Sequence, residues 1–448
     1  MKKSLAVLTL LSAAISGSVS AAEGPVPLGV PALDHVFVIM MENHGYSQII
    51  GNPNAPFANY YAHTANHATK YFAIAHPSLN NYLEVIGGSN FGVQSDNNPD
   101  WHNFYCVNNL TTGIANTDTP ASSNVCPIAG VGTDAAIPAL DSTNETQGAP
   151  GTVNIDGTKS YTAAANTVGK SIADQLVAVG KTWKSYQESL PVEGADRVNY
   201  SDGVFSDSTN FAAILPPLTP ALSQSGVVHL YASKHNPFVY FQSVQEGYDS
   251  NNNLDNTVDF AGSNGLYADL AAGHVPTFSF IAPNQCNDQH GRGNSDQSCN
   301  YDPSDVGTQV GLNPALIIRG DMTLRKIVTS IKKSPVWSQG KNAIVVLWDE
   351  NDYSLAPNTN QVPLIVDTNY SAGAIVSSQY YTHFSLLKSI EAGLNLPCLN
   401  HACDYTETVM TDLFSAAPPP SLPLSANPVL QPTPGIPQKS TSSEDSNK

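Results

Sequence analysis

The sequence HVFVIMM at residues 35–41, followed directly by Glu42-Asn43-His44, decides the fold class. A continuous apolar run of this length predicts a strand that is buried on both faces, as in a mainly parallel sheet. Similar runs at residues 277–281, 343–348 and 363–366 predict further strands, and FVYFQ at residues 238–242 predicts another.

Helical patterns lie between these strands. Apolar residues share one helical face around residues 168–179 and again around residues 324–331, and a third helix is expected over residues 382–392. Asp321 is expected to cap the second of these helices. Because strand and helix patterns alternate, the sequence predicts a doubly wound α/β fold with a central, mainly parallel β-sheet flanked by helices.

The composition narrows the class of protein. The chain has 448 residues, with 19 Lys and Arg against 37 Asp and Glu, and a formal net charge of −18. A hydrophobic share of 41% is enough for a large core, in one large domain or two smaller ones. The acidic balance argues against a protein that binds the nucleic-acid backbone and against docking on anionic lipid through a basic face.

Three segments differ from the globular pattern. Residues 1–22 combine Lys2 and Lys3 with an apolar run and a small-residue cleavage site, which predicts a secretory signal peptide rather than an uncleaved anchor helix. Its removal would leave 17 basic against 37 acidic residues, a net charge of −20. We therefore expect export, to the periplasm or the exterior, without a stable membrane anchor. Residues 90–160 are interpreted as a loop-rich insertion, and residues 416–448 as a disordered Pro- and Ser-rich tail.

The cysteines fit an exported chain. They are Cys106, Cys126, Cys286, Cys299, Cys398 and Cys403. An even number in an exported protein favours disulfides over a zinc site, and the chain has no C-x-x-C spacing. The predicted pairs are 106–126, 286–299 and 398–403, because each closes a short loop.

Acidic residues and histidines follow the predicted strands where ligands bind in open α/β sheets. Glu42-Asn43-His44 follows the first strand, Asp288 and His290 follow the strand at 277–281, and Asp349-Glu350-Asn351-Asp352 follows the strand at 343–348. Each cluster alone is typical of a solvated turn. Three clusters together favour a site for a hard divalent cation.

A serine and three further basic residues complete the candidate site. Ser78 lies near the amino end of an expected helix at residues 79–86, where it is either a nucleophile beside a bound phosphate or only an N-cap. The G-x-S-x-G motif of serine hydrolases is absent, so a metal is the expected activator. Lys234 and His235 either meet an anionic substrate or lie in a surface turn, and His383 is either functional or structural.

The ordered motifs resemble a known family. MMENHGYSQIIG, HPSLNNYLEVIGG, TWKSYQESLP, KHNPFVYF, PNQCNDQH, VVLWDEND and THFSLLKSIEAGLNLP occur in this order. The chain is similar to the phosphoesterase family of bacterial acid phosphatases and phospholipases C, within the alkaline phosphatase superfamily, over residues 34–415. The resemblance implies a single alkaline-phosphatase-like catalytic domain over residues 23–415.

The resemblance also implies roles for particular residues. Glu42, Asn43, Asp349 and Glu350 match the metal-binding motifs of the family, and Ser78 matches its serine nucleophile, which also contacts the metal.

The remaining matches lie around the expected phosphate. His235, Asp288 and His290 match positions near the bound phosphate, with either histidine able to bind phosphate, protonate the leaving group or ligate a metal. His383 matches a family histidine to which the resemblance assigns no role.

These residues imply a mechanism. One divalent ion (Mg, Mn, Ca, Fe or Zn) would activate Ser78 for attack on phosphorus, and Asn43 and the histidines would stabilise the charge that develops. The expected protein is an exported acid phosphatase that hydrolyses phosphate monoesters, phosphoinositides among the candidates, through a phosphoserine, with an acidic optimum. A phospholipase C-type phosphodiesterase that acts on phospholipid head groups is the main alternative, ahead of a sulfatase or a non-catalytic binding protein.

Overall fold

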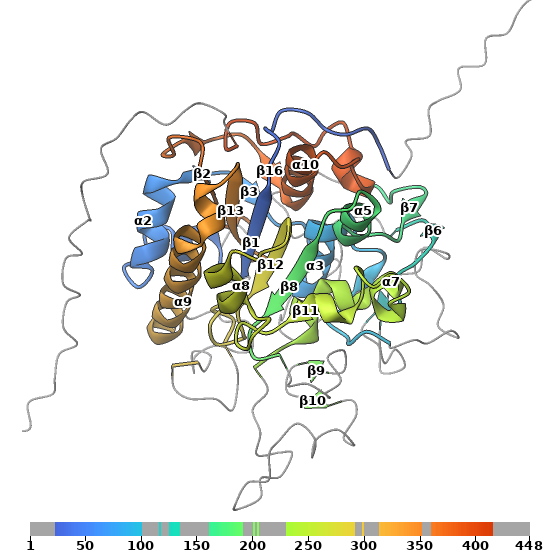
Figure 1. The fold of residues 1–448 in the computed structure, drawn as a ribbon, viewed down its shortest axis with the longest axis horizontal. Coiled ribbons are helices and arrows are strands. Elements are labelled where there is room, and N and C mark those ends of the chain that lie inside the picture. Colours follow the sequence, from blue (N-terminus) through green and yellow to red (C-terminus); the bar gives the residue numbers. More distant parts are fainter. Residues whose placement is uncertain are drawn as a thin grey trace, which may run out of the picture.

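The apolar run at residues 35–41 forms β1 (His35–Met41), near the middle of an eight-stranded sheet in the computed structural model (Figure 1). The strand order is β11-β8-β12-β1-β13-β14-β2-β15. The structure describes residues 23–100, 116–117, 125–134, 161–190, 200–201, 204–205, 230–291, 298–299, 313–351 and 360–414.

The sheet is mainly parallel. Its strands besides β1 are β11 (Thr257–Val258), β8 (Trp183–Gln187), β12 (Phe278–Ala282), β13 (Asn342–Trp348), β14 (Leu364–Thr368), β2 (Asn66–Ala68) and β15 (Val376–Ser377). Within this sheet only β14 runs opposite to its neighbours. The residues of β12 and β13 are all buried, which explains why their sequences are continuously apolar rather than alternating. The predicted fold class is confirmed.

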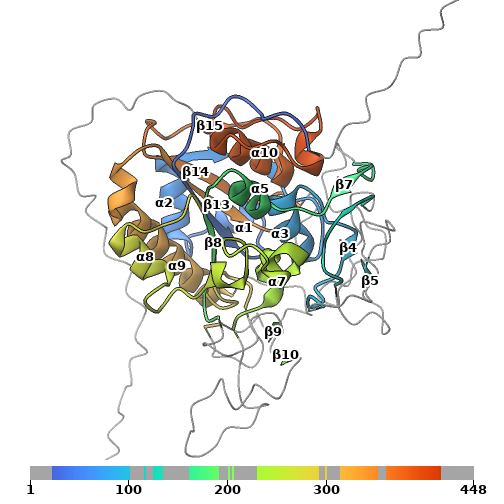
Figure 2. The same cartoon turned by 45° about the vertical axis from the view of Figure 1, so that its right-hand side comes forward.

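Helices cover both faces of the sheet. The α-helices are α1 (Tyr46–Ile49), α2 (Pro56–Thr64), α3 (Ser78–Gly87), α5 (Ile172–Ala178), α7 (Gln242–Glu246), α8 (Leu266–Ala272), α9 (Pro314–Lys333) and α10 (His383–Leu394). Figures 1 and 2 show α2, α8 and α9 together on one side of the sheet and α3, α5 and α10 on the other. Every residue of α3 is buried, because it packs against α10, α5, η3 and η4.

Short elements connect this framework. The 3-10 helices are η3 (Ser233–His235), η4 (Pro237–Tyr240), η5 (Leu254–Asn256), η6 (Pro335–Ser338) and η7 (Asn400–Cys403). The two-residue strands are β3 (Tyr71–Phe72) with β16 (Tyr381–Thr382), β4 (Val93–Gln94) with β5 (Asn116–Thr117), β6 (Val131–Gly132) with β7 (Thr167–Val168), and β9 (Tyr200–Ser201) with β10 (Val204–Phe205).

Two local predictions were wrong. The run at residues 238–242 forms η4 and the start of α7 instead of a strand, because Pro237 begins a helical turn that its ring geometry favours. Asp321 does not cap its own helix, since Asn313 is the N-cap of α9. Asp321 instead accepts hydrogen bonds from the backbone N–H groups of Phe57 and Ala58, at 2.9 and 2.7 Å, and so caps α2 from α9.

The disulfides follow the predicted short loops. Cys286 pairs with Cys299 and Cys398 pairs with Cys403, as expected. Cys106 lies outside the described residues, so the pair 106–126 stays a prediction, as do the signal peptide and the tail. Among the helices that the structure describes, none is long and apolar enough to cross a lipid bilayer.

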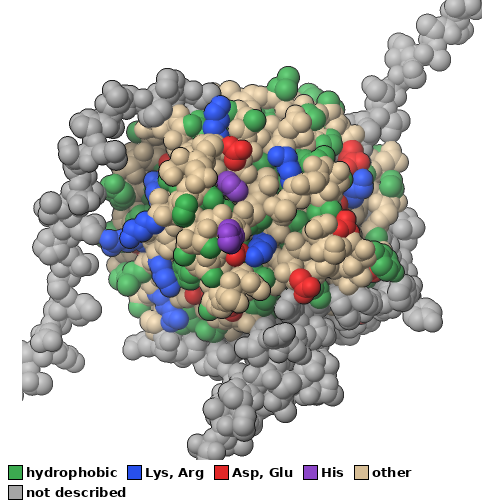
Figure 3. Space-filling model, in the orientation of Figure 1, with side chains coloured by type: hydrophobic (Ala, Val, Ile, Leu, Met, Phe, Trp, Pro, Cys, Tyr) green, Lys and Arg blue, Asp and Glu red, His purple; other side chains and the backbone are tan. Residues whose placement is uncertain are grey.

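The surface charge is not uniform. Although the chain is acidic, α9 exposes Arg325, Lys326, Lys332 and Lys333, and basic side chains gather on that side of the molecule in Figure 3. The global charge therefore does not describe every face. Two of these four cations have structural partners here: Lys332 pairs with Asp367, and Lys326 lies over the Tyr267 ring.

Candidate active site

The carboxyl ends of three neighbouring strands bring the predicted acidic residues together. Glu42 follows β1, Asp288 lies in the loop after β12, and Asp349 follows β13. Backbone hydrogen bonds continue the sheet at this edge, from Glu42 N to Asp288 O at 2.9 Å and from Asp349 N to Met41 O at 3.0 Å. The three carboxylates thus meet because their strands are adjacent and parallel.

Ser78 is the first residue of α3, and its hydroxyl faces this acidic edge. Its Oγ lies 3.2 Å from Glu42 Oε2 and 3.3 Å from Glu350 Oε1, and the residue is completely buried. The N-cap position of α3 is Pro77, so Ser78 does not serve as the N-cap. Its hydroxyl instead lies between two carboxylates at the amino end of α3, where the helix dipole favours an anion.

The segment that carries Ser78 also orients Glu350. His76 Nδ1 lies 3.0 Å from Glu350 Oε2, and Asn81 donates a hydrogen bond of 2.9 Å from Nδ2 to the same oxygen. Asn81 Oδ1 accepts from the backbone N–H groups of Ile74 and Ala75, each at 3.2 Å. The side chain of Glu350 is therefore held in place by residues on both sides of Ser78.

His235 links two of the strand-end carboxylates. Its Nε2 lies 3.1 Å from Glu42 Oε1 and its Nδ1 lies 3.4 Å from Asp288 Oδ2. Tyr82 of α3 stacks on the imidazole, with ring centroids 5.2 Å apart and planes 9° apart. Glu42, His235 and Asp288 each offer one ligand atom, and these atoms lie within 4.8 Å of one another. The prediction had placed His235 and Asp288 at the phosphate; their geometry suits cation binding as well.

Lys234 is buried rather than part of a surface turn. Its Nζ lies 2.8 Å from Asp96 Oδ2, and Asp96 Oδ1 accepts a hydrogen bond of 3.0 Å from the backbone N–H of Leu79. The Lys234 charge partly offsets the rise that burial causes in the pKa values of Glu42 and Asp288. Lys234 therefore supplies positive charge close to Ser78, through a pair that also fixes the amino end of α3.

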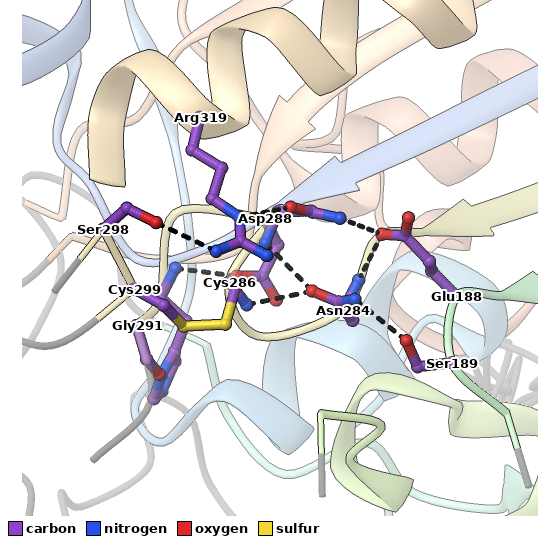
Figure 4. The surroundings of a disulfide bond; sticks show 11 residues. Glu188, Ser189, Asn284, Cys286, Asp288, Gly291, Ser298, Cys299 and Arg319 are labelled. Atoms are coloured by element: carbon purple, nitrogen blue, oxygen red, sulfur yellow. Dashed lines mark hydrogen bonds between the residues drawn. A yellow bond between two sulfur atoms is a disulfide. The ribbon is translucent and has the colours of Figure 1, made fainter. Parts of the chain in front are cut away.

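The loop with Asp288 and His290 is held from three sides (Figure 4). The Cys286–Cys299 disulfide closes it, Arg319 of α9 donates to Asn287 Oδ1 at 2.8 Å and to Ser298 Oγ at 3.1 Å, and Glu188 Oε2 accepts from Asn284 N at 3.1 Å. His290 N donates to Asp288 Oδ1 at 2.7 Å. The His290 ring centroid lies 5.8 Å from that of His235. The loop thus presents both predicted residues to the site.

Burial and like charges raise the pKa values of the clustered carboxyl groups. Burial is the main cause for Glu42, whose pKa is well above its usual value, and the charges of Asp349 and Asp288 add to it. Burial also raises the pKa of Asp288 to about 8 and that of Asp349 to about 6. Anionic carboxylates this close are costly without a compensating cation.

Two buried oxygens support a cation at this place. Asn43 Oδ1 and Asp349 Oδ2 accept no well-formed hydrogen bond from the described residues, although Glu42 and Ser78 lie near Asp349. Buried oxygen atoms without donors are rare in folded proteins. They add oxygen donors of the kind hard divalent ions prefer to the Glu42, His235 and Asp288 ligand atoms, so the residues fit a divalent metal.

All predicted site residues lie in or beside the cluster of acidic side chains at the strand ends. Other residues that were not predicted also belong to it. His383 is buried and contacts the Asp349 backbone. The additional residues are His76, Asn81, Tyr82 and Asp96. Asn81 and Tyr82 could have been found, because positions three and four after Ser78 share its helix face. His76 and Asp96 have no such local signal.

Comparison with known proteins identifies the class of enzyme. The sequence profile of the Phosphoesterase family matches residues 52–301, more than half of the chain. The chain therefore belongs to the Phosphoesterase family, which confirms the resemblance and the predicted enzyme class.

Individual relatives are distant. A phosphatidylinositol-3-phosphatase of Mycobacterium tuberculosis is 24% identical over 408 residues, covering 89% of this chain and 91% of the relative. An acid phosphatase of Aspergillus fumigatus is 21% identical over 368 residues, and the match spans 82% of this chain and 56% of that protein. Among solved structures, a protein of the alkaline phosphatase superfamily from Vibrio parahaemolyticus has a TM-score of 0.43 and 12% identity, covering 86% of this chain and 72% of that one.

Proposed function

We propose that this chain is an exported, metal-dependent phosphatase that hydrolyses phosphate monoesters through a phosphoserine at Ser78. The observation that carries the proposal is the position of the Ser78 hydroxyl, 3.2 Å from Glu42 and 3.3 Å from Glu350 at the amino end of α3. A serine needs a base or a cation to become a nucleophile. The carboxylates beside Ser78 can accept its proton or help to bind a cation.

The strand-end oxygens would hold the metal. Glu42, Asn43 and Asp349 supply buried oxygens, and Ser78 lies close to Glu42 and Glu350. His235 contacts the second carboxylate oxygen of Glu42 and links it to Asp288. A bound divalent ion would supply Lewis-acid stabilisation of negative charge on the serine and phosphoryl oxygens. The metal could be Mg, Mn, Ca, Fe or Zn, because the donor set mixes oxygens with imidazole.

The residues of the chain account for proton movement. The Ser78 proton has two carboxylate acceptors within reach, Glu42 Oε2 and Glu350 Oε1. The Ser78 Oγ–P bond forms while the bond from phosphorus to the leaving oxygen breaks, and the leaving oxygen takes a proton from His290 or His235. Water then attacks the phosphoserine and releases inorganic phosphate, and the serine regains a proton.

Positive groups around Ser78 favour a dianionic phosphoryl group. The helix dipole at the amino end of α3 favours an anion there, while the Leu79 N–H already donates to Asp96. The buried Lys234 adds a positive charge near this end of α3, and protonation of His235 or His290 would add another. A terminal phosphoryl group carries more negative charge than a diester, which favours monoesters over phospholipid diesters.

The relatives suggest a substrate range. One is named a phosphatidylinositol-3-phosphatase and others are named acid phosphatases, so soluble phosphate monoesters and phosphoinositide head groups are candidates here. Export rests on the signal-like residues 1–22.

Turnover of p-nitrophenyl phosphate, measured beside its phosphorylcholine ester, tests the proposal. We expect hydrolysis of the monoester in preference to the diester, loss of activity on chelation, and recovery with a divalent ion. Ser78→Ala should lower kcat by at least about 10³-fold. Ser279→Ala is the matched control, because Ser279 is also buried but lies within β12.

Acid quenching during turnover, followed by mass spectrometry, should trap phosphate on the peptide containing Ser78. Preference for the diester would favour the phospholipase C-type alternative. Parent-like turnover of a folded Ser78→Ala variant would overturn the mechanism.

A further inference from the structure

We propose that His383 is a positioning residue that fixes the peptide group between Asp349 and Glu350. The inference rests on the proposed function, because it assigns a purpose to the orientation of these two acidic residues. His383 is the first residue of α10 and is completely buried. Its Nε2 lies 2.7 Å from the backbone oxygen of Asp349.

The partner atoms define which ring nitrogen carries the proton. A carbonyl oxygen only accepts, so Nε2 of His383 must donate to Asp349 O. The other nitrogen, Nδ1, lies 2.7 Å from the Tyr71 hydroxyl. In a neutral imidazole this nitrogen accepts, and Tyr71 therefore donates to it. The hydroxyl of Tyr71 thus selects the tautomer that can hold Asp349.

The fold brings Tyr71, His383 and Asp349 together. β3 and β16 pair in parallel, with Tyr71 opposite Tyr381, and His383 follows β16 directly. The rings of Tyr71 and His383 cross at 60° with centroids 5.4 Å apart. The amino end of α10 is itself anchored, because Glu407 Oε2 accepts from Thr382 Oγ1 at 2.8 Å and from Ser385 Oγ at 2.6 Å. The backbone that carries the His383 imidazole is therefore held in place.

Among the residues that the structure describes, no backbone N–H of the sheet donates to the carbonyl oxygen of Asp349. The pairing of β13 with β1 ends at Trp348 opposite Met41, and only the Asp349 N–H continues it, to Met41 O. The bond from His383 takes the place of the missing ladder hydrogen bond.

Rotation of this peptide would move both carboxylates. Asp349 Oδ1 accepts from Asn43 N at 3.0 Å, and Glu350 Oε1 lies 3.3 Å from Ser78 Oγ. A tilt at the peptide between them would displace both groups relative to the serine. Fixing one carbonyl oxygen therefore orients two acidic side chains at once.

Amide substitutions at position 383 separate this role from simple packing. The Gln side-chain amide reaches about as far as Nε2 of histidine, whereas the Asn amide reaches only about as far as Nδ1. We expect His383→Gln to retain turnover of p-nitrophenyl phosphate within about threefold. His383→Asn and His383→Leu should lower kcat by about 10- to 100-fold with a smaller change in KM, the range seen when residues that orient metal ligands are removed.

Tyrosine variants and a metal titration complete the test. Tyr71→Phe should lower kcat several-fold, whereas Tyr61→Phe, which removes an equally buried hydroxyl bonded to Asp367, should not. Calorimetric titration with Mn²⁺ should show weaker binding to His383→Asn and to Tyr71→Phe than to His383→Gln.

The outcomes distinguish this inference from the proposed function. Parent-like kcat and Mn²⁺ affinity in folded His383→Asn and Tyr71→Phe variants would overturn the inference. Equal losses in His383→Asn and His383→Gln would also overturn it. If instead Ser78→Ala keeps full turnover, the proposed function is wrong. The Mn²⁺ affinities of the His383 and Tyr71 variants would still test whether His383 positions Asp349 and Glu350.

Discussion

Lys234 Nζ lies 2.8 Å from Asp96 Oδ2, and the side chain of Lys234 is completely shielded from solvent. The same carboxylate accepts from Leu79 N at the start of α3, so one acidic group serves a buried cation and a helix end. A buried lysine that loses its counter-charge is strongly destabilising. Both the stability of the fold and the position of Ser78 therefore depend on Asp96.

Asp96→Ala should lower the free energy of unfolding by about 3 kcal/mol, because it removes the carboxylate that contacts the buried Lys234 ammonium and accepts from the start of α3. Urea unfolding followed by circular dichroism measures this. Glu23→Ala is the matched control, since it removes a carboxylate from an exposed pair with Lys170 and should cost less than about 1 kcal/mol. The double variant Asp96→Leu with Lys234→Met should recover most of the loss, and a double variant as unstable as Asp96→Ala would contradict this account.

Removal of one carboxylate from the strand-end cluster should have opposite effects with and without metal. Asp288→Asn should raise the Tm of metal-free protein by about 2 °C or more, since burial and the charge of Asp349 disfavour the ionised Asp288 carboxylate. The same change should reduce the rise in Tm that Mn²⁺ produces in the parent.

Differential scanning calorimetry of chelated and Mn²⁺-loaded protein measures both effects. Asp269→Asn is the comparison, because Asp269 pairs with Lys184 and accepts from the Tyr186 hydroxyl at 2.7 Å, so its loss should lower Tm. A lower Tm for metal-free Asp288→Asn would show that the carboxylate does not need a cation.

Gly320 of α9 should not tolerate alanine, although alanine ordinarily stabilises a helix by about 1 kcal/mol over glycine. A Cβ at Gly320 would overlap Cγ of Gln289. Gln289 cannot yield easily, since it accepts from Trp348 Nε1 at 2.9 Å and donates to Ile317 O at 3.0 Å.

Because Gln289 stands between Asp288 and His290, Gly320→Ala should lower both the free energy of unfolding, by about 1–3 kcal/mol, and kcat/KM. Urea unfolding and turnover of p-nitrophenyl phosphate measure the two effects. Met322→Ala, at an exposed position of the same helix, should change stability by less than about 0.5 kcal/mol and leave turnover alone. A stabilised, fully active Gly320→Ala would refute this reasoning.

The sequence predicts the centre of the sheet best. The runs at residues 35–41 and 343–348 became β1 and β13 almost to the residue, because strands buried on both faces must be apolar throughout. The run at residues 238–242 is equally apolar and forms helical turns, since burial alone does not distinguish a strand from a buried turn. Only Pro237, which precedes this run, indicated a helical turn rather than a strand.

The candidate site shows the same contrast between residues that the sequence predicts and residues that it does not. Glu42, Asp288 and Asp349 could be found because topology puts the carboxyl ends of parallel strands together. The hydrogen bond of His383 to Asp349 O could not, because it joins a helix start to a strand end 34 residues away. Asp96 and His76 likewise reach the site through tertiary packing, which no local spacing encodes. Sequence patterns thus identify what lies at the strand ends and miss what orients it.

A second buried charge cluster predicts how stability depends on pH. His401 Nδ1 lies 2.8 Å from Asp404 Oδ2 and its Nε2 lies 3.2 Å from Asp134 Oδ2. Burial alone would lower the pKa of His401, but the hydrogen bonds and charges of Asp134 and Asp404 outweigh it and raise the pKa to about 9. Glu84 also faces this group, and the His401 charge partly offsets the rise that burial causes in the Glu84 pKa.

The folded state therefore keeps the His401 proton to higher pH than the unfolded chain, where the pKa is about 6.5. Between these values the folded state binds more protons, so the free energy of unfolding should be highest below pH 6.5 and fall as pH rises through about 9. The full difference corresponds to roughly 3 kcal/mol. Urea unfolding at about pH 6 and about pH 9.5 should show this fall in the parent. His401→Gln should show a fall that is smaller by roughly 3 kcal/mol. The raised pKa of Asp288 contributes the same remaining fall in both proteins. The exposed His63→Gln should keep the parent slope, and equal slopes in all three proteins would exclude the His401 cluster as a cause.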